Sequence, residues 1–130
     1  MSTQTTTQNN FFDTFPKSEI TASNRVLHTP SEFARNNLLY VQEVGTLKSL
    51  KSHCCKRENL DSFLILIVLS GSGVLTYKDE FYNLSASNIA LIDCKHPYSH
   101  QSSEDDPWEL MWVHFNGISA QGYVDYYQHK

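Results

Sequence analysis

Aromatic and imidazole side chains recur at even spacing near the C-terminal end of the chain. Trp108, Trp112 and His114 all lie in the segment 107–117. Residues an even number apart lie on one face of a β-strand, so the pattern predicts a face with two indoles and an imidazole. Such faces stack on the C–H surface of a sugar or on a planar ring, while the N–H groups orient it. We therefore expect all three to line a small-molecule site. The alternative is that both tryptophans pack in the core.

A second polar group follows Pro97. Tyr98 and His100 are two residues apart, so on a strand they share a face and can donate hydrogen bonds into the interior. A surface loop is the alternative. His96 and His100 would lie roughly 13 Å apart on a strand, too far for one metal ion with bonds of about 2 Å. We therefore expect no metal and no cofactor.

Catalysis is not indicated by the remaining motifs. The sequence has no G-x-S-x-G elbow that would expose a nucleophilic serine. The acidic run 104–106 is typical of a solvated loop. The chain is thus not expected to be an enzyme.

These side chains need β-strands to position them. The continuous apolar run 62–69 predicts a strand buried on both faces. Glycines at 71 and 73 indicate a turn, and Lys78-Asp79 indicates a tight hairpin. A short helix is expected after Thr29, and another from Ile118. The predicted strands are 38–45, 49–57, 62–69, 74–77, 80–84, 89–93, 98–102 and 108–115. Strands at this spacing favour a mainly β jelly roll.

Length and charge narrow the function further. A chain of 130 residues predicts one domain. A net charge of −4 without a basic stripe argues against direct nucleic-acid binding. No apolar run reaches the ~20 residues of a membrane span. The first ten residues do not resemble a secretory signal, so we expect a cytoplasmic location and three reduced cysteines. Residues 1–28 are expected to form a flexible arm, whose aromatics at 11, 12 and 15 dock on an apolar surface or cover the core edge.

Three segments together resemble a known family. Residues 69–77, 91–97 and 106–117, the last including Pro-Trp-Glu-Leu-Met-Trp-Val-His-Phe-Asn-Gly, closely resemble the N-terminal effector-binding domain of AraC/XylS-type transcription regulators. The resemblance covers roughly residues 30–127. It implies an all-β, cupin-like double-stranded β-helix or jelly-roll barrel over 29–117, with a C-terminal linker or dimerisation helix beginning over 118–130. It also implies a small effector, often a sugar, and an attached helix-turn-helix DNA-binding domain.

The resemblance also implies roles for single residues. Metal-binding cupins have a histidine where this chain has Tyr98, and they carry a His-x-His pair that this chain lacks, which favours a metal-free pocket. Arg57 matches the place of a basic ligand contact, and the arm around residues 11–16 is expected to fold over the pocket mouth.

The sequence therefore predicts the sensing domain of a longer regulator. Its expected effector is a mono- or oligosaccharide, its DNA contact comes through a domain outside residues 1–130, and it forms a homodimer. The alternatives are a small metal-dependent cupin enzyme, such as a sugar isomerase or dioxygenase, and a structural dimerisation module with a filled barrel.

Overall fold

The computed structural model describes residues 21–49 and 54–128. The predicted contacts of the aromatics at 11, 12 and 15 lie outside these residues. The elements in chain order are β1 (Thr21–Leu27), α2 (Glu32–Asn37), β2 (Leu39–Ser49), β3 (Cys54–Arg57), β4 (Phe63–Ser70), β5 (Ser72–Tyr77), β6 (Glu80–Ser85), β7 (Ile89–Asp93), β8 (Tyr98–Ser102), β9 (Glu109–Gly117) and α3 (Ala120–Gln128).

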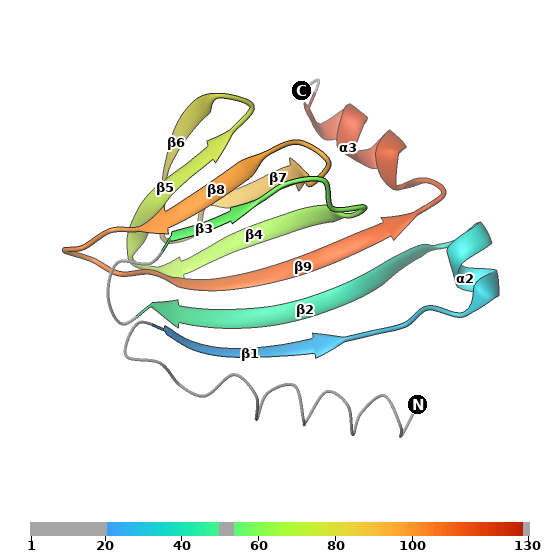
Figure 1. Cartoon of the computed structure of the whole chain (residues 1–130), viewed down its shortest axis with the longest axis horizontal. Helices are drawn as coiled ribbons and strands as arrows, with labels where there is room; N and C mark the ends of the chain where they lie inside the picture. Colours follow the sequence, from blue (N-terminus) through green and yellow to red (C-terminus); the bar gives the residue numbers. More distant parts are fainter. Residues whose placement is uncertain (1–20, 50–53, 129–130) are drawn as a thin grey trace.

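Two antiparallel sheets form the body of the domain (Figure 1). Sheet A has the strand order β1-β2-β9-β4-β7, and sheet B has the order β3-β8-β5-β6. The described helices, α2 and α3, lie at one end of the sheets, on the right in Figure 1. The predicted mainly β jelly roll with a C-terminal helix is thus confirmed.

The core lies between the sheets because alternate residues of each strand turn inward. On β4, Leu64, Leu66 and Val68 are buried against the facing sheet. The opposite face of the same strand is also partly covered, because Phe63 packs with Phe115 against α3. This double covering explains why the apolar run of β4 does not alternate with polar residues.

Turn residues set the connections between strands. Gly71 joins β4 to β5 at φ 77°, where an added Cβ would lie 2.4 Å from the Pro107 carbonyl oxygen. Lys78 and Asp79 adopt φ 51° and 65°, which is the geometry of a two-residue hairpin turn. Both turns were predicted from the sequence.

The predicted flexible arm does not extend to residue 28. Residues 21–27 form β1, which pairs with β2 along its whole length, for example Arg25 with Gly45 and Val26 with Val44. The segment lacks the apolar alternation by which a strand is recognised. Its order comes from main-chain hydrogen bonds to the edge of β2, which a local pattern does not reveal.

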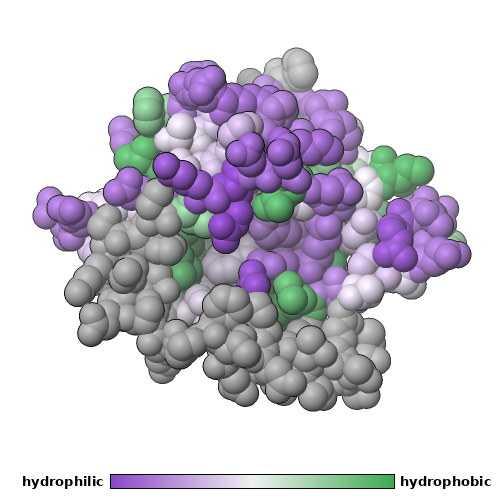
Figure 2. Space-filling view, viewed as in Figure 1, coloured by the Kyte–Doolittle hydropathy of each residue, from purple (hydrophilic) through white to green (hydrophobic). Residues whose placement is uncertain are grey.

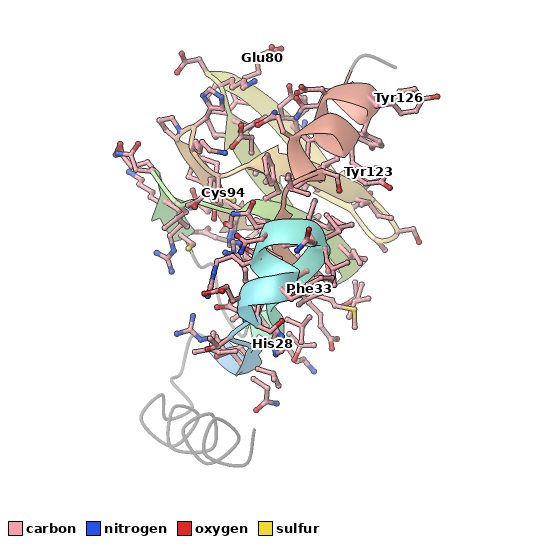
Figure 3. All side chains as sticks on the ribbon, turned by 90° about the vertical axis from the view of Figure 1, so that its right-hand side faces the viewer. His28, Phe33, Glu80, Cys94, Tyr123 and Tyr126 are labelled. Atoms are coloured by element: carbon pink, nitrogen blue, oxygen red, sulfur yellow. The ribbon has the colours of Figure 1, made fainter. Side chains whose placement is uncertain are left out.

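Helix α3 covers part of the outer face of sheet A. Ala120 and Val124 are buried there, whereas Tyr123 and Tyr126 are 62% and 68% exposed. Figure 3 looks onto this end of the molecule, and Tyr126 projects away from the sheets. Figure 2 shows hydrophilic residues over most of the upper half of the molecule, where sheet B lies.

Candidate functional site

On the inner face of β9, the indole of Trp112 is fixed in one orientation by its neighbours on β2. Trp112 lies opposite Gly45 of β2, and a Cβ at position 45 would stand 2.3 Å from the indole Cζ2 atom. The ring therefore lies against the backbone of β2, in space that only glycine leaves open. The indole Nε1–H donates a hydrogen bond of 2.7 Å to Glu43. The contact with Gly45 and the hydrogen bond to Glu43 fix the orientation of the ring. Because Trp112 is only half-buried, part of its surface stays accessible.

Glu43, which accepts this hydrogen bond, also forms an ion pair with Arg25. The Glu43 carboxylate lies 3.5 Å from the Arg25 guanidinium of β1, and the two side chains are 15% and 32% exposed. The pair adds charged groups to the same interior wall as the indole. Strand β1 is therefore part of the wall of the candidate site.

His114 continues this wall two residues beyond Trp112. Its Nδ1 atom lies 2.9 Å from the Ser62 hydroxyl. Burial lowers the pKa of His114 below its ordinary value; Glu43 raises it, while Arg57 and Arg25 lower it further. Because its pKa is lowered, the imidazole of His114 is uncharged at neutral pH. One of its nitrogens is hydrogen-bonded to the Ser62 hydroxyl. Such a ring can still donate or accept at its other nitrogen.

Sheet B supplies the facing wall. Arg57 of β3 pairs with Tyr98 of β8, and Cys55 pairs with His100. Tyr98 is buried, and burial raises its pKa far above the ordinary value of 10, with a further contribution from Cys94 and an opposing one from Arg57. The phenol therefore stays protonated. A hollow of about 310 Å³ lies at the edge of sheet B, lined by Arg57 and Tyr98 together with the outward-facing Lys56, Thr76 and Ser99, so it opens on the outer side of the sheet and not between the sheets.

Trp108 occupies a different environment from Trp112. It is 0% exposed and packs in the main core cluster, with its ring atoms in space that a side chain at Gly73 would fill. Its Nε1–H meets no hydrogen-bond acceptor among the described residues. Half-buried His100 lies 5.8 Å from it, ring centre to ring centre. Trp108 thus faces inward, as its spacing predicted, but packs as core.

Sequence reasoning missed several members of this cluster. Glu43 and Gly45 lie opposite His114 and Trp112, and buried Ser62 is hydrogen-bonded to His114. The even spacing of Glu43 and Gly45 in the predicted strand 38–45 would have placed them on one face. No comparable signal existed for Arg25, since its strand was not recognised.

Two further observations concern the described residues. Within the described residues, no three His, Cys, Asp or Glu side chains gather closely enough to hold a metal ion. No helix in the same ranges is long and apolar enough to cross a membrane. The interior wall contains one oriented indole, hydrogen-bonding rings and the Arg25 guanidinium, while Arg57 is exposed and donates a hydrogen bond to the Lys56 carbonyl oxygen.

Comparison with known proteins agrees with this description. The family described as the AraC-like ligand binding domain matches residues 40–130. The chain therefore belongs to this family of cupin-like ligand-binding domains. Its fold resembles the Cupin_2 domain of an XRE family transcriptional regulator from Enterobacter cloacae, with a TM-score of 0.57 at 10% identity, over 73% of this chain and 95% of that one.

Two curated relatives are transcription regulators by name. The chain is 28% identical over 97 residues to the Msm operon regulatory protein of Streptococcus mutans, covering 74% of this chain and 35% of the relative. It is 33% identical over 58 residues to the lactose operon transcription activator of Staphylococcus xylosus, covering 45% of this chain and 21% of the relative. The chain thus spans about a third or less of the relatives' length.

Proposed function

We propose that this domain senses a sugar and relays its occupancy to a DNA-binding domain of the same regulator. Membership of the ligand-binding family and the relatives' names support a regulatory role. The observation that carries the sugar assignment is the held, half-buried indole of Trp112. An indole of fixed orientation stacks on the C–H face of a pyranose, and neighbouring polar groups then select its hydroxyls.

The proposed ligand site lies between the inner faces of the two sheets. Trp112 supplies the stacking surface, and His114, Tyr98, His100 and Arg57 supply hydrogen bonds from the surrounding strands. Glu43 and Arg25 are added because they orient or flank the indole. Trp108 is left out because it is completely enclosed.

The proposal extends to the parent protein. Residues 118–130 would begin a linker or dimerisation helix, and the exposed tyrosines of α3 are suited to a homodimer contact. DNA would be read by a domain outside this chain, in the cytoplasm. A gel shift with the 130-residue chain should show no specific complex at physiological salt, because its net charge is −4.

Calorimetric titration with a panel of mono- and oligosaccharides, lactose included, tests the sugar assignment. Trp112→Ala should weaken binding about ten- to a hundredfold, as expected when roughly 1–3 kcal/mol of aromatic contact is lost. Met111→Ala is the matched control, because Met111 is the adjacent residue on the outer face.

Two results would contradict the proposal. One is the absence of binding by any sugar in the panel. The other is a Trp112→Ala variant that melts at a much lower temperature yet binds with unchanged affinity, since Trp112 would then act as core.

A further inference from the structure

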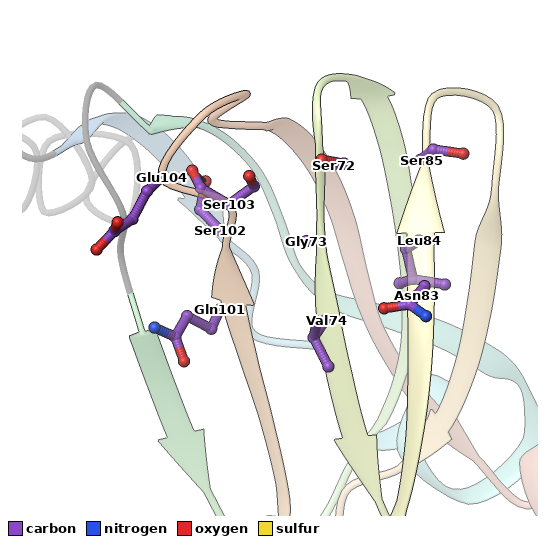
Figure 4. Close-up of a pocket in the computed structure, with 10 residues that line it drawn as sticks. All are labelled: Ser72, Gly73, Val74, Asn83, Leu84, Ser85, Gln101, Ser102, Ser103 and Glu104. Carbon is purple, nitrogen blue, oxygen red and sulfur yellow. Dashed lines mark hydrogen bonds between the residues drawn. The ribbon is translucent and has the colours of Figure 1, made fainter.

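The outer face of sheet B holds a hollow that the interior site does not use. Its volume is about 540 Å³, and it is lined by residues of β5, β6 and β8 and of the loop after β8 (Figure 4). Val74 and Gln101 alternate with the inward-facing Leu75 and His100, so the hollow lies on the outer side of the sheet. Val74 pairs with both Asn83 and Gln101, so these side chains form one row across the three strands. Ser72, Ser85 and Ser103 line the hollow beside this row.

The outer face of β5, β6 and β8 is uncharged and mostly polar. The outward positions of the three strands are Phe81, Asn83, Ser85, Ser72, Val74, Thr76, Ser99, Gln101 and, just after β8, Ser103. None of these side chains is charged, and the nearest charged position on this face of the sheet is Lys56 of β3, which pairs with Ser99. Amides and hydroxyls dominate instead, which is the donor and acceptor set that matches a polyol.

The amides are available to a ligand. Among the described residues, neither the Asn83 nor the Gln101 side chain has a hydrogen-bond partner, and both are exposed. Each amide offers a donor and an acceptor. Because β5 lies between their strands, the two residues are roughly 10 Å apart, a span that suits hydroxyls on different units of an oligosaccharide. The Glu104 carboxylate at one edge of the hollow can accept from another hydroxyl.

An aromatic ring lies on the same face. Phe81 is two residues from Asn83 along β6, roughly 7 Å away at strand spacing, and is 77% exposed. A large exposed ring flanking uncharged amides gives a stacking surface next to hydrogen-bonding groups. The acidic residues at 104, 105 and 106 beside the hollow disfavour anions.

We propose that the outer face of β5, β6 and β8 is a second saccharide site, for a neutral oligosaccharide. Asn83 and Gln101 bind ring hydroxyls, Glu104 accepts a hydrogen bond at one edge, and Phe81 stacks on a sugar unit at the other. The volume of the hollow falls in the range of about 300–1,000 Å³ typical of small-molecule sites. The site is independent of the interior one, because it lies on the opposite side of sheet B.

The test is a two-dimensional NMR titration of the 130-residue chain with maltotriose, raffinose and lactose at millimolar concentrations. We expect saturable shifts of backbone amides in β5, β6 and β8 and of the Asn83 and Gln101 side-chain amides. The double variant Asn83→Ala/Gln101→Ala should bind about tenfold more weakly, given the loss of two hydrogen bonds. Phe81→Ala should weaken binding similarly.

The controls separate this site from the interior one. Asn24→Ala removes an exposed amide from sheet A and should leave the shifts unchanged. Trp112→Ala should also retain them, whether or not the interior site binds sugar. The proposal is overturned if no probe gives saturable shifts on this face, if the double variant binds as well as the parent, or if the shifts follow protein concentration rather than sugar.

Discussion

Gly45→Ala tests the geometry on which the interior site rests. The new methyl group would stand 2.3–2.9 Å from three carbon atoms of the Trp112 indole. Ordinary contact begins near 3.4 Å, so the ring must move by about 1 Å or tilt away from β2. That movement pulls the indole Nε1–H from Glu43, because the bond is 2.7 Å long and the carboxylate is also paired with Arg25.

The expected loss of stability is moderate. Overpacking a well-filled position costs about 1–3 kcal/mol, and a half-buried ring can relax toward solvent, which favours the lower part of that range. A hydrogen bond to a charged acceptor adds roughly 1 kcal/mol after allowance for exposure. Together these terms predict a loss of about 2 kcal/mol in the free energy of unfolding, or a melting temperature lower by roughly 6–12 °C.

Thermal melts and acrylamide quenching of tryptophan fluorescence provide the measurements. The chain has two tryptophans, and Trp108 is 0% exposed, so a rise in quenching reports movement of Trp112. Gly122→Ala is the matched control. A Cβ there meets nothing within 4 Å, and the change should stabilise α3 by about 0.5–1 kcal/mol. Unchanged stability and quenching in Gly45→Ala would refute the described position of the indole.

Three further predictions follow from individual residues. Because burial lowers the pKa of His114 below 6.5, the unfolded chain binds this proton more readily; the free energy of unfolding should therefore fall as pH drops below 6.5 toward the folded pKa. Urea titrations should show a weaker fall in His114→Gln, and equal slopes would contradict the assignment. Iodoacetamide should label half-buried Cys55 before Cys94, which is 0% exposed and whose pKa is raised by burial; early labelling of Cys94 in peptide mass spectra would count against its burial. Replacing Lys78-Asp79 with Asn-Gly should stabilise the hairpin by roughly 1 kcal/mol, since both residues have positive φ, and a thermal melt without any gain would argue against that turn.

Several elements could be predicted because their signals are local. The signals for the β4 strand, for the turn at Gly71 and for the Lys78-Asp79 hairpin are each contained within a short stretch of sequence. The even spacing over residues 108–114 correctly placed Trp108 and Trp112 on the inward face, where both pack with the core cluster, and His114 opposite the buried Leu64. Strand β1 was missed because its order depends on pairing with β2, more than 15 residues away in the sequence.

What the sequence alone determined is the alternation of faces and the resemblance to a ligand-binding family. Only the tertiary structure decided which tryptophan is buried completely and which stays accessible. Trp108 and Trp112 share a face, but Trp108 packs over Gly73 within the core, whereas Trp112 lies over Gly45 with its N–H on Glu43. Spacing fixes the direction of a side chain, while burial depends on residues brought from distant strands, and these are known only once the sheets have paired.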